Sequence, residues 1–233
     1  MVGTISGVIG GLGKSIVRDS LAAYFDASYS QSYPGTGSTW SDMSGNGVDG
    51  TLTGGYTFSN NNSFLFNGTT GYFPYSVSNT LAMSIITVAR APASTWNNFG
   101  LLGSSRATVN GWIIHSESGA ATVTMYLYNS TGGGVTAVGT ITTATITDIN
   151  MYTLTTNGSN SHKRYLNGSL IGTNTTAITR SATPTTASVQ LAKDLTLARY
   201  FNGYIYFHAV YNKELSQEEI SQNYYALGRQ LGF

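Results

Sequence analysis

Six Asn-Gly pairs stand along this chain between short runs rich in Val, Ile, Thr, Tyr and Phe. Asn and Gly both tolerate positive φ, so the pair is the strongest short signal for a tight turn between antiparallel strands. The pairs begin at residues 46, 67, 110, 157, 167 and 202. Many short strands with regular turns predict an antiparallel sandwich or barrel.

The composition agrees with a packed domain and excludes several functions. Hydrophobic residues make up 41% of the chain and aromatic residues 12%, which a disordered chain would lack. Charged residues make up only 9%, and the net charge of +1 gives no electrostatic footprint for nucleic acid or an anionic membrane. No apolar run is long enough to span a bilayer, and residues 1–4 show no signal peptide. The absence of Cys excludes disulfides and thiolate metal sites.

A single helix is predicted at the C-terminus. Ser216 and Glu219 have the spacing of a capping box, and Leu215 with Ile220 would form a hydrophobic staple. Gly232 is placed to end the helix. The apolar face would carry Ile220, Tyr224, Leu227 and Leu231.

The first 20 residues differ from the rest, because glycines interrupt short aliphatic pairs there. We expect residues 1–20 to form an N-terminal arm and residues 21–233 to form one domain. Such an arm needs an anchor, on its own domain or on a neighbouring subunit. The apolar side chains expected to be buried against adjacent subunits are Val8, Ile9 and Ile16.

One loop resembles the first half of a calcium loop. Asp42, Asn46 and Asp49 would supply oxygen ligands, with Gly47 at the bend. The alternative is that Asp42 and Asn46 cap a tight turn through side-chain to backbone hydrogen bonds. Calcium is therefore an optional ligand, and no cofactor is required.

Aromatic side chains outside the obvious strands are candidates for stacking on sugar rings, because pyranose faces pack on aromatic rings. Tyr33, Trp40 and Trp96 are the candidates for glycan binding. The alternative is that they belong to the core of an aromatic-rich sandwich.

Catalytic signatures are weak. Glycoside hydrolysis needs two carboxylates roughly 5–10 Å apart, and nothing in the sequence places Glu117 beside Asp148. No Gly-x-Ser-x-Gly nucleophile motif is present. We therefore expect a protein that is not an enzyme, with a hydrolase as a minor alternative.

Five segments together resemble laminin G-like, concanavalin A-like jelly-roll domains, most closely those in virion proteins of tailed bacteriophages. The segments are 21–27 (LAAYFDA), 32–52 (SYPGTGSTWSDMSGNGVDGTL), 64–73 (FLFNGTTGYF), 165–172 (YLNGSLIG) and 201–220 (FNGYIYFHAVYNKELSQEEI). The resemblance spans residues 21–231. It implies an all-β, antiparallel two-sheet jelly-roll sandwich, to which the residues themselves add one short C-terminal helix and a glycine-rich N-terminal arm.

The resemblance implies a structural protein of a bacteriophage virion, such as a capsid decoration or cement protein on the virion surface. Its partners would be other virion subunits, either the major capsid protein or copies of itself. The alternative is an adhesin, in a tail fibre or on the capsid, that binds host or cell-surface polysaccharide. Because one fold serves many functions, residues must decide between these hypotheses.

Overall fold

The computed structural model describes residues 15–60, 62–93, 100–106, 108–117, 119–142 and 145–233. Short strands dominate it, and one helix follows them. The elements in chain order are β1 (Leu21–Asp26), β2 (Thr39–Trp40), β3 (Gly50–Thr51), β4 (Tyr56–Ser59), β5 (Ser63–Asn67), β6 (Phe73–Asn79), β7 (Met83–Arg90), β8 (Leu101–Ser104), β9 (Trp112–Ser116), β10 (Thr122–Tyr128), β11 (Val135–Thr142), β12 (Asn150–Thr156), β13 (His162–Leu166), β14 (Ser169–Asn174), β15 (Thr185–Leu191), β16 (Asn202–Tyr211) and α1 (Gln217–Leu231).

Within the described residues the strands form an eight-stranded sheet, a six-stranded sheet and a small β2–β3 ribbon. The larger sheet has the order β14-β13-β12-β7-β16-β5-β4, with β1 also paired to β16, and the smaller has the order β11-β10-β9-β8-β15-β6. All pairs are antiparallel. The predicted all-β, two-sheet jelly-roll sandwich is confirmed.

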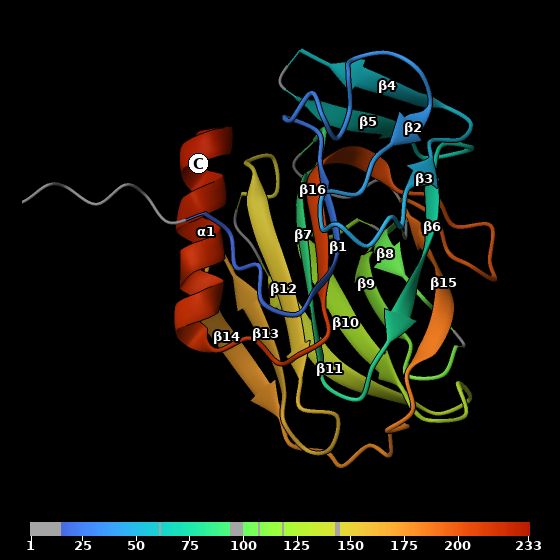
Figure 1. The fold of residues 1–233 in the computed structure, drawn as a ribbon, viewed down its shortest axis with the longest axis vertical. Coiled ribbons are helices and arrows are strands. Elements are labelled where there is room, and N and C mark those ends of the chain that lie inside the picture. Colours follow the sequence, from blue (N-terminus) through green and yellow to red (C-terminus); the bar gives the residue numbers. More distant parts are fainter. Residues whose placement is uncertain (1–14, 61, 94–99, 107, 118, 143–144) are drawn as a thin grey trace, which may run out of the picture.

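The molecule has three layers: α1, the eight-stranded sheet and the six-stranded sheet (Figure 1). The middle layer is covered on both faces at its centre, so β7 and β16 are buried at nearly every position. In β7, Ile85 packs between the sheets while its neighbour Ile86 packs on the helix side. The outer face of the six-stranded sheet is not covered by α1, which makes it the place to look for a ligand site.

The helix forms as the sequence predicts. The Ser216 hydroxyl accepts from the backbone N–H of Glu219, and the Glu219 side chain accepts from the backbone N–H of Ser216. Leu215 and Ile220 are both buried, and Gly232 ends the helix in the left-handed conformation. The capping box, the staple and the stop are therefore confirmed.

Residues 15–20 pack against the helix rather than projecting away from the domain. The backbone N–H of Val17 donates to Asn223 Oδ1 at 2.8 Å, and Gln222 donates to the carbonyl of Ser15 at 2.7 Å. Ile16 is only 6% exposed and belongs to the apolar cluster under α1. The prediction that Ile16 is buried by another subunit is thus corrected, because its own domain covers it. Val8 and Ile9 lie outside the described residues.

Arg164 joins the two sheets by hydrogen bonds at one edge of the sandwich. From β13 its guanidinium donates to the carbonyls of Val138 and Thr140 on β11, the edge strand of the opposite sheet. Gly139 and Gly172 leave room for it, since a Cβ at either position would lie 2.6 Å from a guanidinium nitrogen. Arg164 thus covers part of an edge that would otherwise present unpaired carbonyls.

Arg180 ties together the loops at one end of the sandwich. It is 6% exposed and donates to the backbone carbonyls of Leu81, Thr80, Asn110, Gly111 and Tyr128. Burial lowers the pKa of Arg180 to about 10, so it stays charged at neutral pH. The hydrogen bonds of Arg180 to these carbonyls therefore fix the position of Tyr128, the last residue of β10.

Candidate functional site

Strand β10 shows why the outer face of the six-stranded sheet carries aromatic side chains. Val123, Met125 and Leu127 point into the core between the sheets. The alternate residues Tyr126 and Tyr128 therefore lie on the outer face, where they pack with Ile113 of β9. These rings form a third apolar cluster, separate from the core between the sheets and from the core under α1.

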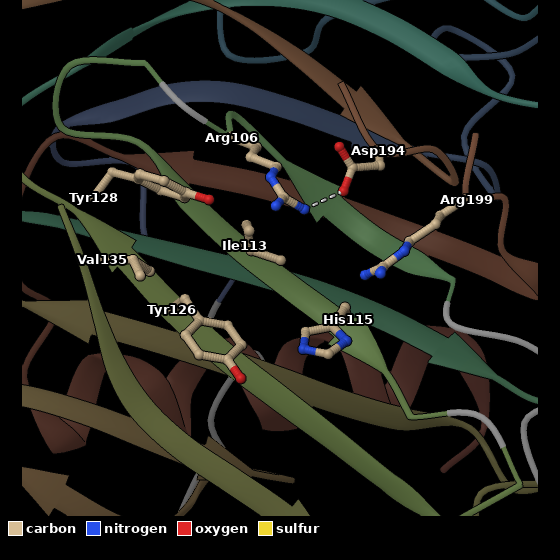
Figure 2. A pocket seen from close by; sticks show the side chains of 8 residues that line it. All are labelled: Arg106, Ile113, His115, Tyr126, Tyr128, Val135, Asp194 and Arg199. Atoms are coloured by element: carbon tan, nitrogen blue, oxygen red, sulfur yellow. Dashed lines mark hydrogen bonds and ion pairs between the residues drawn. The ribbon is translucent and has the colours of Figure 1, made fainter. Parts of the chain in front are cut away.

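A pocket of about 220 Å³ opens beside this cluster. Figure 2 shows Ile113 at its centre, the two tyrosines on one side, and the guanidinium of Arg199 reaching in from the other. The lining side chains are Arg106, Ile113, His115, Tyr126, Tyr128, Val135, Asp194 and Arg199. Aromatic surface on one wall faces hydrogen-bonding groups on the other.

Asp194 organises the polar wall. Its Oδ2 accepts from Arg106 at 2.8 Å, and its Oδ1 accepts from the backbone N–H groups of Thr196 and Leu197. Burial on its own would raise the pKa of Asp194. The hydrogen bonds from Thr196 and Arg106 outweigh burial and lower the pKa, so the carboxylate is ionised at neutral pH.

His115 joins the aromatic wall to the polar wall. Its ring stacks on Tyr126 with centroids 5.5 Å apart, and its Nε2 lies 3.5 Å from Glu117 Oε1. Burial is the main cause that lowers the pKa of His115, and the nearby Arg199 and Arg106 act in the same direction against the opposing charge of Glu117. The ring is therefore neutral at neutral pH and can donate one hydrogen bond and accept another.

The structure places the predicted sugar-stacking residues elsewhere. Trp40 is 0% exposed and packs against Phe25, Phe64 and Phe73. Tyr33 is 4% exposed and donates its hydroxyl hydrogen to the carbonyl of Gly37. Both rings belong to the inner core, so the prediction that they contact a glycan is corrected. Trp96 lies outside the described residues.

The predicted calcium ligands do lie together, but their oxygens face donors of the chain. The Asp42 carboxylate accepts from the backbone N–H groups of Tyr24, Ser44 and Val48, and Asp49 accepts from the backbone N–H of Asp42. The Asn46 amide donates to the carbonyl of Leu21. The bonds to Asp42 engage both of its carboxylate oxygens, and the Asn46 amide nitrogen is held by the backbone, so the geometry fits the turn-capping alternative. Calcium binding stays a prediction.

Glu117 and Asp148, the candidate carboxylates for glycoside hydrolysis, lie in different parts of the molecule. Glu117 stands beside His115, whereas Asp148 lines a separate pocket next to α1. Among the described residues, no group of three or more His, Cys, Asp or Glu side chains could hold a metal ion. Asp194 is the one carboxylate among the described residues that line the pocket by Tyr126.

The residues of this pocket were missed by sequence reasoning. They come from β9, β10, β11, the segment after β8 and the loop after β15, so no local motif unites them. Alternation along β10 is the available signal, because Tyr126 and Tyr128 alternate with Met125 and Leu127. That pattern predicts aromatic rings on the face opposite the core.

The chain thus folds as a β-sandwich of two antiparallel sheets with a pocket on the outer face of the smaller sheet. A family model described as the concanavalin A-like lectin/glucanases superfamily (laminin G-like) matches residues 67–221, more than half of the chain. The chain belongs to this superfamily, as the sequence resemblance predicts. A comparison with curated proteins found no match.

Solved structures with a similar fold include binding domains of botulinum neurotoxins. One is the binding domain of neurotoxin DC in complex with rat synaptotagmin II (TM-score 0.67, 17% identity, 91% of this chain and 52% of that chain). Another is the same domain in complex with SialylT (TM-score 0.70, 15% identity, 90% and 52%). A third, of neurotoxin type C, is described as interacting with two ganglioside molecules (TM-score 0.67, 16% identity, 91% and 52%). The chain spans about half the length of these structures, and the likeness concerns the fold.

Proposed function

We propose that this protein is a non-enzymatic carbohydrate-binding module whose site is the pocket beside Tyr126. The observation that carries the proposal is the pairing of an aromatic wall with a hydrogen-bonding wall on the one sheet face that α1 does not cover. A sugar would stack its C–H face on the tyrosine and bond its hydroxyls to the polar wall.

Two further points support this proposal. The superfamily is named for lectins as well as glucanases, and structures of similar fold are described with SialylT or gangliosides. A catalytic role is less well supported, because glycoside hydrolysis needs a pair of carboxylates. Among the described residues that line the pocket, Asp194 is the one acidic residue, and its carboxylate forms an ion pair with Arg106.

The test is the substitution Tyr126→Ala, with Tyr225→Ala as the matched control. Tyr225 is 65% exposed on α1, on the other side of the molecule, so its loss removes an exposed ring without touching the pocket. We expect Tyr126→Ala to weaken binding of the best ligand on a glycan array by about tenfold or more, as loss of a stacked ring costs on the order of 1–2 kcal/mol. Isothermal titration with that ligand measures the change.

Equal binding by wild type and Tyr126→Ala would contradict the placement of the site. A loss of binding in Tyr225→Ala but not in Tyr126→Ala would point to a site on α1 instead. Thermal unfolding of each variant separates a lost contact from a damaged domain.

A place in a bacteriophage virion stays a prediction from the sequence resemblance. A surface module that binds polysaccharide is compatible with it, since a decoration protein or a tail adhesin can display such a site. Within the described residues, no helix is long and apolar enough to cross a membrane.

A further inference from the structure

We propose that the protein has a second carbohydrate site, in the pocket between the C-terminal end of α1 and the segment before β12, and that it thereby links two sugar chains. The site binds a sugar through its hydroxyl groups, with Arg90 as donor and Asp148 as acceptor. The ligand class rests on the proposed carbohydrate-binding function, whereas the pocket itself is separate from the one beside Tyr126.

This second pocket lies where five parts of the chain meet. Arg90 ends β7, Asp148 precedes β12, Asn167 follows β13, Tyr206 belongs to β16, and Phe233 follows α1. The pocket has a volume of about 560 Å³. That volume falls within the roughly 300–1,000 Å³ of small-molecule pockets, so it leaves room for a short oligosaccharide.

Two asparagines fix the segment before β12. The Asn150 amide donates to the carbonyls of Thr145 and Asp148, at 3.0 and 2.9 Å, and its oxygen accepts from Asn167 Nδ2 at 2.9 Å. Asn167 Oδ1 accepts in turn from the backbone N–H of Met151. The backbone that carries Asp148 is therefore ordered before any ligand arrives, which reduces the cost of binding.

Arg90 supplies hydrogen-bond donors to this pocket. Its Nε donates to the Tyr206 hydroxyl at 2.8 Å, and its guanidinium carbon lies 3.9 Å from the ring centroid of Tyr204. These contacts hold the side chain, while its two terminal nitrogens have no hydrogen-bond partner among the described residues. Since a guanidinium carries five N–H donors, most of them are available to a ligand.

Asp148 supplies the acceptors. Its side chain is exposed, and its carboxylate has no hydrogen-bond or ion-pair partner in the described part of the chain. Arg90 and Asp148 line the same pocket without forming an ion pair with one another. An uncommitted donor and an uncommitted acceptor around one pocket match the hydroxyls of a sugar, because each hydroxyl both donates and accepts.

Two aromatic rings supply the apolar part of the lining. Tyr224 and Phe233 both line the pocket, with their ring centroids 5.5 Å apart. Tyr224 also packs on the turn after β13, where a Cβ at Gly168 would lie 3.1 Å from it. The ring is therefore held in position, and the C–H face of a sugar can pack on such a surface.

The two pockets lie on opposite faces of the sandwich. Tyr126 lies on the outer face of the six-stranded sheet, whereas Tyr206 and Tyr224 belong to the apolar cluster under α1. Both sheets therefore separate the two pockets, as the three layers in Figure 1 show. Two sugar chains can bind at once without meeting, so a single molecule would link them.

The experiment first removes the stacking ring of the other pocket. Tyr126→Ala is screened on an array of neutral glycans, whose hydrogen-bonding groups include many hydroxyls. Each glycan that this variant retains is then titrated calorimetrically against Tyr126→Ala combined with Asp148→Ala, and against Tyr126→Ala combined with Phe233→Ala. The first combination removes the acceptor of the second pocket, and the second removes one of its rings.

Each of these substitutions has a matched control in the same background. Asp19→Ala removes an exposed carboxylate whose ion pair with Lys213, at 2.6 Å, lies at the surface and contributes little to stability. Tyr225→Ala removes an exposed ring of α1 that is not among the described residues lining this pocket. Thermal unfolding of every variant shows whether the domain stays intact.

We expect Tyr126→Ala to retain at least one neutral glycan. Adding Asp148→Ala or Phe233→Ala should lower the affinity for it by about tenfold, as expected for one hydrogen bond to a charged group or one stacked ring, with an unchanged thermal midpoint. The two controls should leave the affinity unchanged. Wild-type protein should also link beads that carry this glycan to beads that carry the best ligand of the other pocket, and Phe233→Ala alone should abolish the linking.

Other outcomes overturn the inference in distinguishable ways. If the wild type binds neutral glycans and Tyr126→Ala binds none, the pocket next to α1 is not a carbohydrate site and the proposed function stands. Equal losses in Asp148→Ala and Asp19→Ala, or in Phe233→Ala and Tyr225→Ala, reject this pocket as the place of binding. A wild-type protein that binds no glycan contradicts both proposals together.

Discussion

At the scale of single residues, the most unusual side chain is a histidine inside the sandwich. His208 is 0% exposed, and its Nε2 and Nδ1 lie 2.6 Å from the Tyr75 hydroxyl and 3.0 Å from the Thr87 hydroxyl. Its ring stacks on Trp112 at 5.8 Å. Burial lowers the pKa of His208 to about 3. A polar group of this kind is tolerated in a core because both ring nitrogens have partners.

His208 should make the protein less stable in mild acid. Between about pH 6.5 and the folded pKa of about 3, the unfolded chain takes up a proton at this ring that the folded chain does not. The free energy of unfolding should therefore fall as the pH is lowered, by about 2 kcal/mol between about pH 7 and pH 5. Urea titrations at several pH values measure this fall.

The substitution His208→Gln isolates this effect. It keeps a hydrogen-bonding group but removes the titration, so stability should depend on pH much less steeply in this window. His115→Gln is the matched control, because His115 is only partly buried and its pKa is lowered without the same enclosure. The carboxylates with lowered pKa, such as Asp194, titrate at more acidic pH. If His208→Gln retains the full pH dependence of the wild type, another group causes it.

At the scale of elements, the Asn-Gly pairs show what local sequence can and cannot predict. Asn167-Gly168 joins β13 to β14 with both φ angles positive, at 51° and 80°, as the hairpin signal predicts. Asn67 and Asn157 act differently, because each side-chain oxygen accepts from three backbone N–H groups of the following loop. Asn202 instead begins β16. An Asn-Gly pair permits positive φ angles, and the surrounding structure determines whether it forms a hairpin turn, caps a loop or begins a strand.

Burial of aromatic residues was less predictable for a similar reason. Trp40 lies in a two-residue strand between loops, so its sequence neighbours look like those of an exposed turn. Its environment comes from β1, β5 and β6, which bring Phe25, Phe64 and Phe73 around it. The pocket residues are equally non-local. The helix was predictable to its caps because a capping box, a staple and a glycine stop all lie within one segment.

The edge strand β11 allows a sharp test of how the two sheets are joined. Its register shifts opposite Met125 and Tyr126, and Gly139 at this bulge has φ of 128° with the Arg164 guanidinium close above it. We expect Gly139→Ala to lower the free energy of unfolding by about 1–3 kcal/mol, because the backbone is strained and the arginine must move. Urea unfolding measures the loss.

Gly133→Ala is the control for this prediction. Gly133 lies in the exposed turn before β11, its φ is not in the left-handed region, and its nearest contact would be an ordinary 3.5 Å. Its substitution should change stability by less than about 0.5 kcal/mol. Equal effects at both glycines would show that Arg164 does not need the space above β11.

At the scale of the whole molecule, the last strand in the chain holds the centre of the larger sheet. β16 pairs with β7 along one side and with β1 and β5 along the other, so Leu21 lies opposite Tyr211. Its side chains reach both cores, with Ile205 between the sheets and Phe207 under α1. The two ends of the domain therefore complete one sheet together, and neither half of the chain has a finished core alone.

This arrangement predicts that a proline will be far more damaging in β16 than at the edge of the same sheet. Ala209 is 0% exposed and is paired on both sides, to Tyr24 and to Ile86, whereas Thr173 lies on β14, which among the described strands pairs with β13 alone. A proline removes a backbone donor and fixes φ, which central strands do not accommodate and edge strands do. We expect Ala209→Pro to abolish cooperative urea unfolding and the near-ultraviolet circular dichroism of the packed aromatics. Thr173→Pro should retain both, with a loss of about 1–3 kcal/mol. Comparable losses in the two variants would mean that β16 does not hold the layers together, because the same backbone change would then cost the same at the centre and at the rim.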